Sequence, residues 1–317
     1  MIPTMVKFIA IRVLRAATVF FAVTFVTFAI VYANPAAIAR NVVGISANDD
    51  AVRAEIVKLG LDRPLLEQYQ HWLAGLIHGD LGQSYFTGQP VLTTLGIRFP
   101  VTLALMILSL VLTVVLSVLI GVSSAVRGGW PDRLLQFLSV IGGAIPSFIV
   151  AIGLVFAFAV ALPLFPATGY VSPDVSIGDW AASITLPVLA ILVGSIAGAA
   201  AQFRGAVKDV LDRDFVRTLR ARGLSERAVI YRHVLRNAGG PGLTVLSLLT
   251  IGLLGGVVII EQVFALPGMG SLVTDAASRG DVSVVMGCVA VTVLLVSVVN
   301  LVTDLLTTAL NPKARAS

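Results

Sequence analysis

Charged side chains are scarce in this sequence. Only 12% of its 317 residues are Asp, Glu, Lys or Arg, whereas 57% are hydrophobic, and the mean hydropathy is +0.96. Soluble domains carry roughly 25% charged residues. The composition therefore excludes an ordinary soluble protein and indicates an integral membrane protein with several spans and one small insert, without room for a second large soluble domain.

Cysteine and histidine are almost absent. The only cysteine, Cys288, lies in an apolar run, so it forms neither an internal disulfide nor a cysteine metal cluster, and we interpret it as a small packing residue. The histidines His71, His78 and His233 lie far apart and outside the apolar runs, where they make no metal-binding cluster. No histidine is placed to activate a serine inside the membrane. We therefore expect no catalytic residue, no cofactor and no metal site in this chain.

The sequence also lacks a phosphate-binding loop. The pattern Gly-x-x-x-x-Gly-Lys-Ser/Thr is missing, and the dipeptide Gly-Lys occurs nowhere. A chain without this loop does not cradle ATP phosphates in that way. The energy for any active process must come from other subunits.

Six apolar runs are each read as a membrane span. A helix needs roughly 20 residues to span a hydrocarbon core of about 30 Å, and the first run is longer than the apolar region of a signal peptide, about 7–15 residues. The runs are Ala16–Ala33, Phe99–Val126, Leu134–Ala161, Ala181–Phe203, Asn237–Ile260 and Val282–Thr303. We predict an all-α integral membrane protein with six transmembrane helices.

The distribution of basic residues predicts the orientation of these helices. Cytoplasmic loops are enriched in Lys and Arg. If the N-terminus, the turn Arg127–Arg133, the loop 204–242 and the C-terminal tail are cytoplasmic, that side holds 16 of the 22 basic residues. The opposite loops Pro163–Trp180 and Pro267–Asp281 hold only Arg279. Both termini are therefore predicted to lie inside.

The spans divide the chain into three parts. Residues 1–33 contain an N-terminal segment and the first span, 34–98 a polar extracytoplasmic insert, and 99–317 the core with spans two to six and the loop 204–242.

The insert is predicted to contain two amphipathic helices. The first ends at Gly60, and the second has Asp62 as its cap and ends before Gly79. Their apolar faces consist of Val52, Ile56 and Leu59 in the first helix, and of Leu65, Tyr69, Trp72, Leu73 and Leu76 in the second. The surface of this module is a candidate docking face for a partner protein.

The loop 204–242 is the one long polar interruption in the second half of the chain. It holds nine of the 22 basic residues against four acidic ones. Apolar residues recur every four positions, at Val207, Leu211, Phe215 and Leu219. Gly223 is suited to stop this first short helix, and Ser225 to cap a second one. The pattern predicts a rigid elbow between two membrane helices, which transmits a push from outside the membrane inward.

Two other interpretations of this loop explain fewer of its features. The positive-inside rule alone explains its charge, but not its helix–glycine–helix pattern. A DNA-binding helix-turn-helix needs free access to a major groove, whereas both ends of this loop enter the membrane. We therefore expect no nucleic acid partner.

The elbow resembles a known family at the level of motifs. The segments Asp214–Ser225, DFVRTLRARGLS, and Arg232–Ala238, RHVLRNA, are similar to the EAA-type coupling loop of ABC importer permeases. They are most similar to the B-type subunit of dipeptide/oligopeptide importers. Leu219 departs from the Arg-Thr-Ala that is common there, and Leu235-Arg236 replaces the usual Leu-Pro. The resemblance implies that contacts with the ATPases come from Asp214, Arg217, Thr218, Leu219, Arg220, Ala221, Arg222, Gly223, Leu224 and Ser225.

Further similarities extend the resemblance over nearly the whole chain, most strongly at Glu261–Gly270, EQVFALPGMG. It implies a type I ABC importer permease fold in the bacterial inner membrane. The implied partners are membrane lipid, a second permease of C-type, two ABC ATPases that carry ATP and Mg, and an extracytoplasmic substrate-binding lipoprotein. The family transports di- and oligopeptides, nickel chelates or haem. A stand-alone secondary transporter is the alternative, but the spans hold almost no buried charge for ion coupling.

The sequence singles out three further groups of residues, of which the prolines and the turn have open interpretations. Pro146 and Pro187 interrupt the third and fourth apolar runs and are either kinks that line a pathway or kinks that only improve packing. The small-residue segments Gly194–Gly198 and Leu253–Gly256 favour close helix packing. The turn Leu266, Pro267, Gly268, Met269 and Gly270 either touches the binding protein or caps the pathway, or else is an ordinary turn packed on the outer module.

Overall fold

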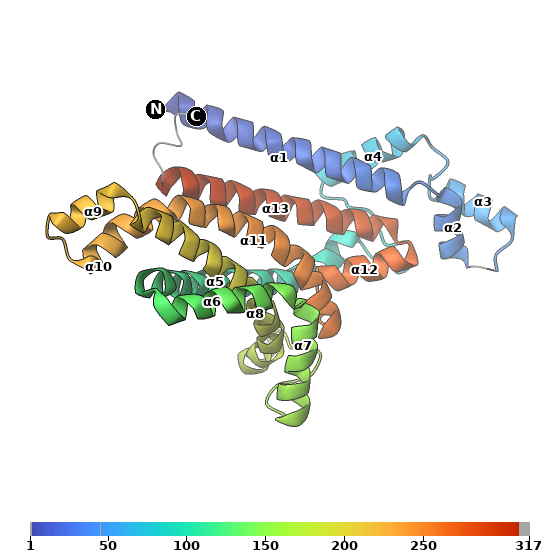
Figure 1. Ribbon diagram of the computed structural model, residues 1–317. Coiled ribbons are helices and arrows are strands. Elements are labelled where there is room, and N and C mark those ends of the chain that lie inside the picture. The colour runs from blue at the N-terminus through green and yellow to red at the C-terminus, as the bar shows by residue number, and fades with distance from the viewer. Residues whose placement is uncertain (1, 45, 311–317) are drawn as a thin grey trace. The chain divides into compact units, whose positions relative to one another are not determined.

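The fold is helical throughout the part of the chain that the structure describes (Figure 1). The computed structural model describes residues 2–44 and 46–310, but not the side chains of 2–9, 239–248, 250–251, 303–304 and 306–310. Within these residues the chain forms helices and loops, and the one β-type contact is an isolated bridge between Gln83 and Pro90. The predicted all-α class is confirmed.

The chain divides into two compact units. Unit 1 comprises Met1–Thr102 and Pro267–Val298, and unit 2 comprises Leu103–Leu266 and Val299–Ser317. Both units therefore combine segments that are distant in the sequence.

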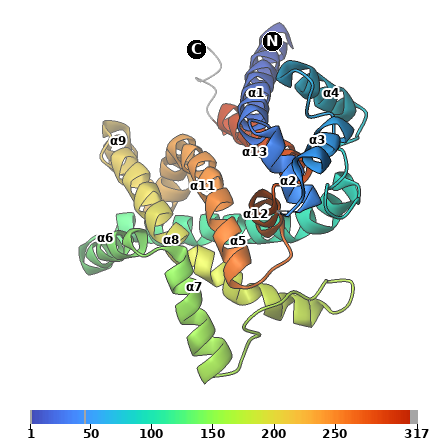
Figure 2. The same cartoon turned by 90° about the vertical axis from the view of Figure 1, so that its right-hand side faces the viewer.

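Unit 1 contains the first helix and the polar insert. Its helices are α1 (Ile2–Val31), α2 (Pro35–Val43), α3 (Asp49–Lys58), α4 (Leu65–Ile77), α12 (Met269–Arg279), the start of α5 (Val91–Arg127) and most of α13 (Val282–Leu310). Figure 2 shows α2, α3 and α4 grouped beside α1. Buried Tyr69 of α4 joins its hydroxyl to that of Thr24 in α1 over 2.8 Å, so the insert is anchored to the first helix.

The two predicted insert helices are present as α3 and α4. Gly60 and Gly79 follow them with φ of +67° and +80°, which confirms both predicted helix ends. The predicted cap Asp62 is wrong, because Pro64 holds the cap position of α4 and no side chain caps it. The fixed φ of proline starts the helix here, and Asp62 lies two residues too early for a cap.

Unit 2 is built around α8 (Ile177–Leu211). This helix contacts α6 (Gly129–Ala144), α7 (Ser147–Val155) and α11 (Leu235–Val263). Unit 2 also contains most of α5 and the end of α13. Its shorter elements are η1 (Phe156–Ala161), α9 (Asp214–Ala221), α10 (Glu226–Ala228) and η2 (Val229–Val234), where η denotes a π-helix. A Cβ at Gly142 of α6 would lie 2.7 Å from the Cβ of Ala197, so α6 and α8 meet at small residues, as the sequence predicts for Gly194–Gly198.

Each of the six predicted spans coincides with helix. Among the described residues, four helices are long and apolar enough to cross a membrane, and the pair α6 and α7–η1 makes a fifth span if it counts as one. α11 contributes the shorter apolar segment Gly252–Val263. The number of six spans and the inward orientation of both termini remain predictions.

Candidate functional site

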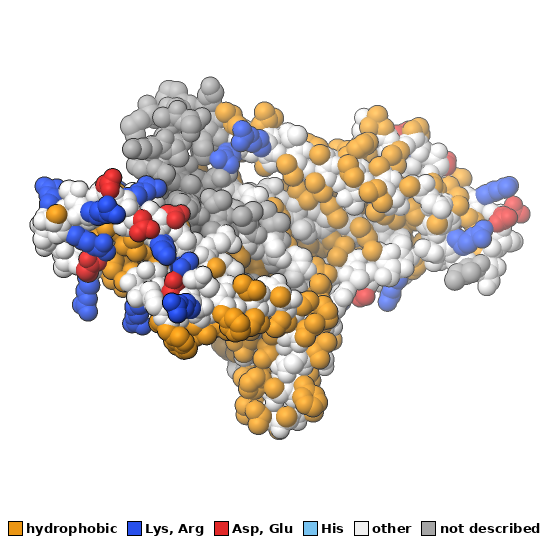
Figure 3. Space-filling model, viewed as in Figure 1, with side chains coloured by type: hydrophobic (Ala, Val, Ile, Leu, Met, Phe, Trp, Pro, Cys, Tyr) orange, Lys and Arg blue, Asp and Glu red, His pale blue; other side chains and the backbone are white. Residues whose placement is uncertain are grey.

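The polar loop forms an elbow that connects α8 directly with α11. We define the elbow as residues 212–234, which comprise α9, α10 and η2. Figure 3 shows basic and acidic side chains gathered over α9 and α10, whereas apolar side chains cover α7. The elbow is thus the polar end of an otherwise apolar group of helices.

The two helical parts of the elbow differ from the prediction in their limits. The predicted first helix, from Val207 to Leu219, is interrupted, because α8 ends at Leu211 and α9 starts at Asp214. Asp favours helix ends over helix interiors, and Asp212 and Asp214 flank this break. The predicted second helix is not separate, since α10 and η2 continue into α11.

The predicted stop and cap between the two parts are confirmed. Gly223 has a φ of +78°, a conformation that suits glycine. The Oγ of Ser225 accepts a hydrogen bond from the backbone N–H of Ala228 over 3.4 Å. The chain therefore reverses at Gly223 and begins its return toward α11 at Ser225.

The inner face of the elbow is apolar and closely packed. Val207 at the end of α8, Val216 of α9 and Val229 and Val234 of η2 are at most 1% exposed. They form one cluster, against which Leu219 and others are packed. Burying a valine side chain stabilises by about 1.5–3 kcal/mol, so these contacts fix the elbow to the ends of α8 and α11.

The outer face of the elbow is polar and open. Of the ten predicted ATPase-coupling residues, Leu219 and Leu224 are half-buried and the other eight are exposed. The ion pairs on this face, Asp214 with Arg217 at 3.8 Å and Arg220 with Glu226 at 2.7 Å, are themselves exposed and contribute at most about 1 kcal/mol each. The face is therefore available for a partner, and its role in coupling remains a prediction.

The break at Pro146 is the sharpest bend in unit 2. The helix pair Gly129–Ala144 and Ser147–Ala161 is bent by 92°, and α7 starts directly after Pro146. Proline cannot donate the backbone hydrogen bond that would continue α6. The predicted interruption of the third apolar run is confirmed, with a bend much larger than a kink inside one span.

Pro187 behaves differently from Pro146. It is buried inside α8, which continues from Ile177 to Leu211 without a break. It is not among the residues that line the cavity between α7, α8 and α11, which is described below. Its geometry agrees with the packing interpretation.

A cavity of about 310 Å³ opens between α7, α8 and α11. It is lined by Ser147 of α7, Ile191, Gly194, Ser195 and Gln202 of α8, and Leu249, Gly252, Leu253 and Gly256 of α11. None of these lining residues is charged. Gly194, Ser195 and Gly256 belong to segments that the sequence assigns to helix packing, so the small-residue pattern also marks a cavity wall.

The segment Leu266–Gly270 is mostly buried. Leu266 and Met269 are 1% and 5% exposed, and Gly268 and Gly270 are also buried. The backbone N–H of Met269 donates to Oγ1 of Thr102 over 2.8 Å, at the start of α12. Met269 packs with Leu81 of the insert in one apolar cluster. This contact agrees with the interpretation of an ordinary turn packed on the insert. A contact with a binding protein remains a prediction.

The described residues contain no group of three or more His, Cys, Asp or Glu side chains that could hold a metal ion. Cys288 is buried in the apolar cluster of unit 1, as expected for a packing residue.

Sequence comparison identifies the family. Residues 117–316 match the family described as "Binding-protein-dependent transport system inner membrane component", and residues 5–106 match the N-terminal part of the same type of component. A peptide transport system permease protein of Brucella abortus is 36% identical, with 96% of this chain and 97% of the relative covered. A glutathione transport system permease protein of Escherichia coli O6:H1 is 33% identical, with 98% and 99% covered.

Structural comparison supports the fold. A chain of the MetNI methionine ABC transporter, solved in inward-facing conformations, matches 70% of this chain and 94% of its own length, with a TM-score of 0.50 and 18% sequence identity. At this identity the match shows the fold alone, which is that of a type I ABC importer permease. With the apolar helices and the family match, the chain is a multi-pass protein of the bacterial inner membrane. The chain belongs to the inner-membrane permeases of binding-protein-dependent ABC importers.

Proposed function

We propose that this permease forms half of a translocation pathway for peptides and is driven through the elbow by partner ATPases. The observation that carries the proposal is that the elbow joins α8 to α11, and that these two helices supply eight of the nine residues lining the cavity. A displacement of the elbow therefore moves the main walls of the cavity.

The energy in this scheme comes from outside the chain. ATP binding closes two partner ATPases, which draw the elbows of two permease subunits together and open the pathway outward. Hydrolysis then resets the pathway inward. ATP and Mg belong to the ATPases, since this sequence has no phosphate-binding loop. The second, C-type permease supplies the other half of the pathway, and an extracytoplasmic lipoprotein delivers the substrate.

Peptides are the substrate class that the relatives favour. The names of the aligned relatives refer to peptides and to glutathione, which is itself a tripeptide. The cavity wall offers hydroxyl, amide and small side chains such as Ser147, Ser195 and Gln202 and no charged group. Such a wall neither traps nor repels cargo of either charge, which suits peptides of varied sequence. Nickel chelates and haem are the alternative cargoes.

The decisive experiment is purification of the solubilised chain with its co-expressed candidate partners. We expect two ATPases and a second permease to co-purify, and the complex to take up peptides into proteoliposomes when a binding protein and ATP are present. Competition with dipeptides, tripeptides, a nickel chelate and haem ranks the cargoes. A lone subunit that transports without ATP would support a secondary transporter instead.

A pair of variants tests the elbow in the same preparation. Ala221→Trp places a large ring on the exposed end of α9 and should abolish co-purification of the ATPases. Ala181→Trp places the same ring on an exposed position near the opposite end of α8 and should leave co-purification intact. If the two variants co-purify the ATPases to the same extent, the elbow does not form the ATPase contact.

A further inference from the structure

Three helices of unit 2 meet at the carboxylate of Asp132, in the first turn of α6. Arg204 of α8 donates from Nε to Oδ1 and from Nη2 to Oδ2 of Asp132, the second over 2.6 Å. Ser124 of α5 donates its hydroxyl to Oδ1 over 2.8 Å. The sequence identifies Arg204 only as one of nine basic residues and gives no sign of its two partners.

This ion pair differs from the pairs on the elbow. The side chains of Arg204 and Asp132 are 16% and 15% exposed, whereas those of Arg217 and Asp214 are 77% and 97% exposed. Paired hydrogen bonds between guanidinium and carboxylate fix both distance and direction. Because removing one partner would leave a largely buried charge unpaired, this contact resists opening more than an exposed pair does.

The surrounding contacts place this carboxylate at a mechanical junction. A Cβ at Gly121 would lie 2.7 Å from the carbonyl oxygen of Ala200, so α5 and α8 touch backbone to backbone beside Arg204. The apolar cluster of the elbow includes Val122 and Ala125 of α5 in addition to the end of α8. The elbow, the end of α5 and the end of α8 therefore form one packed block, and Asp132 is where α6 joins it.

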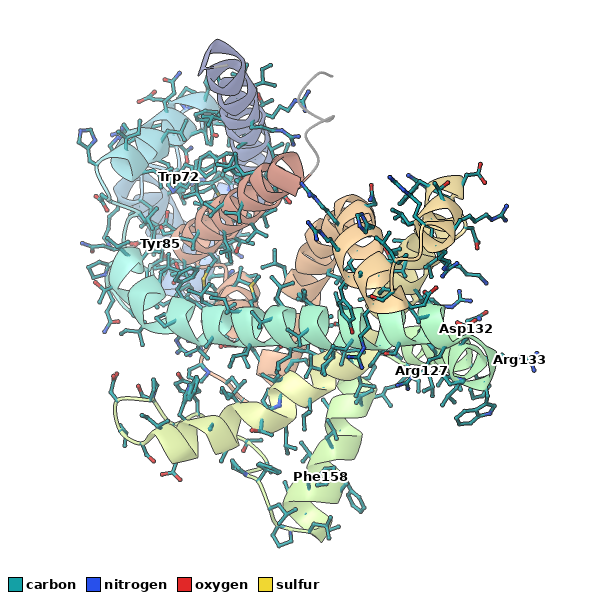
Figure 4. All side chains as sticks on the ribbon, turned by 90° about the vertical axis from the view of Figure 1, so that its left-hand side faces the viewer. Trp72, Tyr85, Arg127, Asp132, Arg133 and Phe158 are labelled. Atoms are coloured by element: carbon teal, nitrogen blue, oxygen red, sulfur yellow. The ribbon has the colours of Figure 1, made fainter. Side chains whose placement is uncertain are left out.

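Helix α6 leads from this junction to the cavity. It starts with Asp132 in its first turn and ends immediately before the 92° break at Pro146, and the next residue, Ser147, lines the cavity. A second contact, from Oγ of Ser139 to the carbonyl oxygen of Ala197 over 2.8 Å, keeps α6 alongside α8. In Figure 4, Asp132 lies close to the helices of unit 2, whereas Arg133, also of α6, extends away from them.

We propose that Asp132, Arg204 and Ser124 form a clasp that makes α6 move together with α8 when the elbow is displaced. The displacement then reaches the break at Pro146 and shifts the cavity wall at Ser147. The three residues are positioning residues, because they act through helices and do not line the cavity. This inference rests on the proposed function, since it assumes that partner ATPases displace the elbow.

The test measures transport and ATP hydrolysis separately in the reconstituted complex. Asp132→Asn keeps the size of the side chain but removes its charge. We expect ATPases to bind and to be stimulated normally, while the number of peptides transported per ATP falls by about fivefold or more, the lower end of typical coupling between sites. The double variant Asp132→Arg with Arg204→Asp restores an ion pair and should recover much of this ratio.

Arg133→Gln is the matched control, because it removes one charge from the neighbouring exposed residue of the same turn. Its transport per ATP should equal that of the wild type. If Asp132→Asn does not assemble, Arg204→Lys takes its place, since it keeps the charge but loses the paired geometry. An unchanged ratio in the assembled variant, or a proportional loss of transport and hydrolysis without recovery in the double variant, would overturn the clasp. A wild-type chain that binds no ATPase would overturn the proposed function as well.

Discussion

At the scale of single residues, Gly223 determines how the elbow turns. Its φ of +78° is incompatible with proline, whose ring fixes φ near −65°. Gly223→Pro also removes the N–H that donates to the carbonyl oxygen of Arg220 over 2.9 Å. We expect the variant to insert into the membrane, but transport by the complex to fall by about fivefold or more as coupling is lost. The measurement is peptide uptake together with ATPase stimulation.

A second glycine provides the control for this variant. Gly205 lies in the same polar stretch but within α8, and a Cβ there would meet open space. Gly205→Ala should leave uptake and stimulation unchanged. If Gly223→Pro shows normal peptide uptake and normal ATPase stimulation, the elbow does not couple the ATPases to transport.

In unit 1, Asp281 is a single residue whose carboxylate holds distant parts of the chain together. It is 5% exposed, precedes α13, and accepts hydrogen bonds from Oγ of Ser84 over 2.5 Å and from the N–H of Tyr85 over 3.3 Å. Hydrogen bonds to a charged group contribute about 1.5–3 kcal/mol each. We expect Asp281→Asn to lower the midpoint of thermal unfolding in detergent, with exposed Asp275→Asn as the control. Equal midpoints for the two variants would contradict a structural role for the carboxylate.

The sequence predicts some of these residues and not others, for a physical reason. Gly223 and Ser225 act on their own neighbours, so a local pattern is sufficient to predict them. Asp281 and Ser84 are 197 positions apart, and Asp132 and Arg204 are 72 positions apart. Contacts of this kind depend on how distant helices pack, which a single sequence does not contain.

At the scale of elements, α6 and α8 meet at a close contact between small residues. A Cβ at Gly142 would lie 2.7 Å from the Cβ of Ala197, whereas a Cβ at Gly143 would meet nothing within 4 Å. Overpacking typically costs about 1–3 kcal/mol, so Gly142→Ala should lower the midpoint of thermal unfolding. Gly143→Ala, one position away, should not lower it. Adding Ala197→Gly to Gly142→Ala should restore the midpoint, and failure of this rescue would refute the contact.

The elements that the sequence analysis missed had recognisable local signals. Asn34 caps α2, because its Oδ1 accepts a hydrogen bond from the N–H of Ala37 over 3.0 Å, and Pro35 is the first residue of the helix. α12 ends with Arg279 and with Gly280 at a φ of +77°. The interpretation of 267–281 as a plain external loop left this helix out. The π-helical turn η2, which continues into α11, had no comparable signal.

At the scale of the whole molecule, the apolar runs predict the helices, whereas the way the helices cross the membrane remains a prediction. Each run coincides with helix because length and composition suffice to predict a long apolar helix. The bend of 92° at Pro146 leaves two possibilities for α6 and α7, either one broken span or a re-entrant loop. Hydropathy does not distinguish these possibilities, since both contain the same residues.

Labelling with a membrane-impermeant thiol reagent decides between the two. Cys288 is 2% exposed, so the wild-type chain should not react and provides the background. Arg133→Cys, before the bend, should be labelled only after the inner membrane is permeabilised, and Asp174→Cys, beyond it, should be labelled in intact spheroplasts. The exposed positions Asp49 and Arg213 serve as external and cytoplasmic references.

The side from which Asp174→Cys is labelled determines the orientation of α8 and of the elbow in the membrane. If Asp174→Cys and Arg133→Cys are labelled from the same side, the bent pair is re-entrant. The elbow would then lie on the side of the membrane opposite to Arg133, because α8 crosses the membrane once between Asp174 and Arg213. ATPases in the cytoplasm could not reach both the turn Arg127–Arg133 and the elbow. Since Asp132 and Arg204 are in direct contact, we expect labelling of Arg133→Cys and Arg213→Cys from the cytoplasm and of Asp174→Cys from outside, as a broken but complete third span requires.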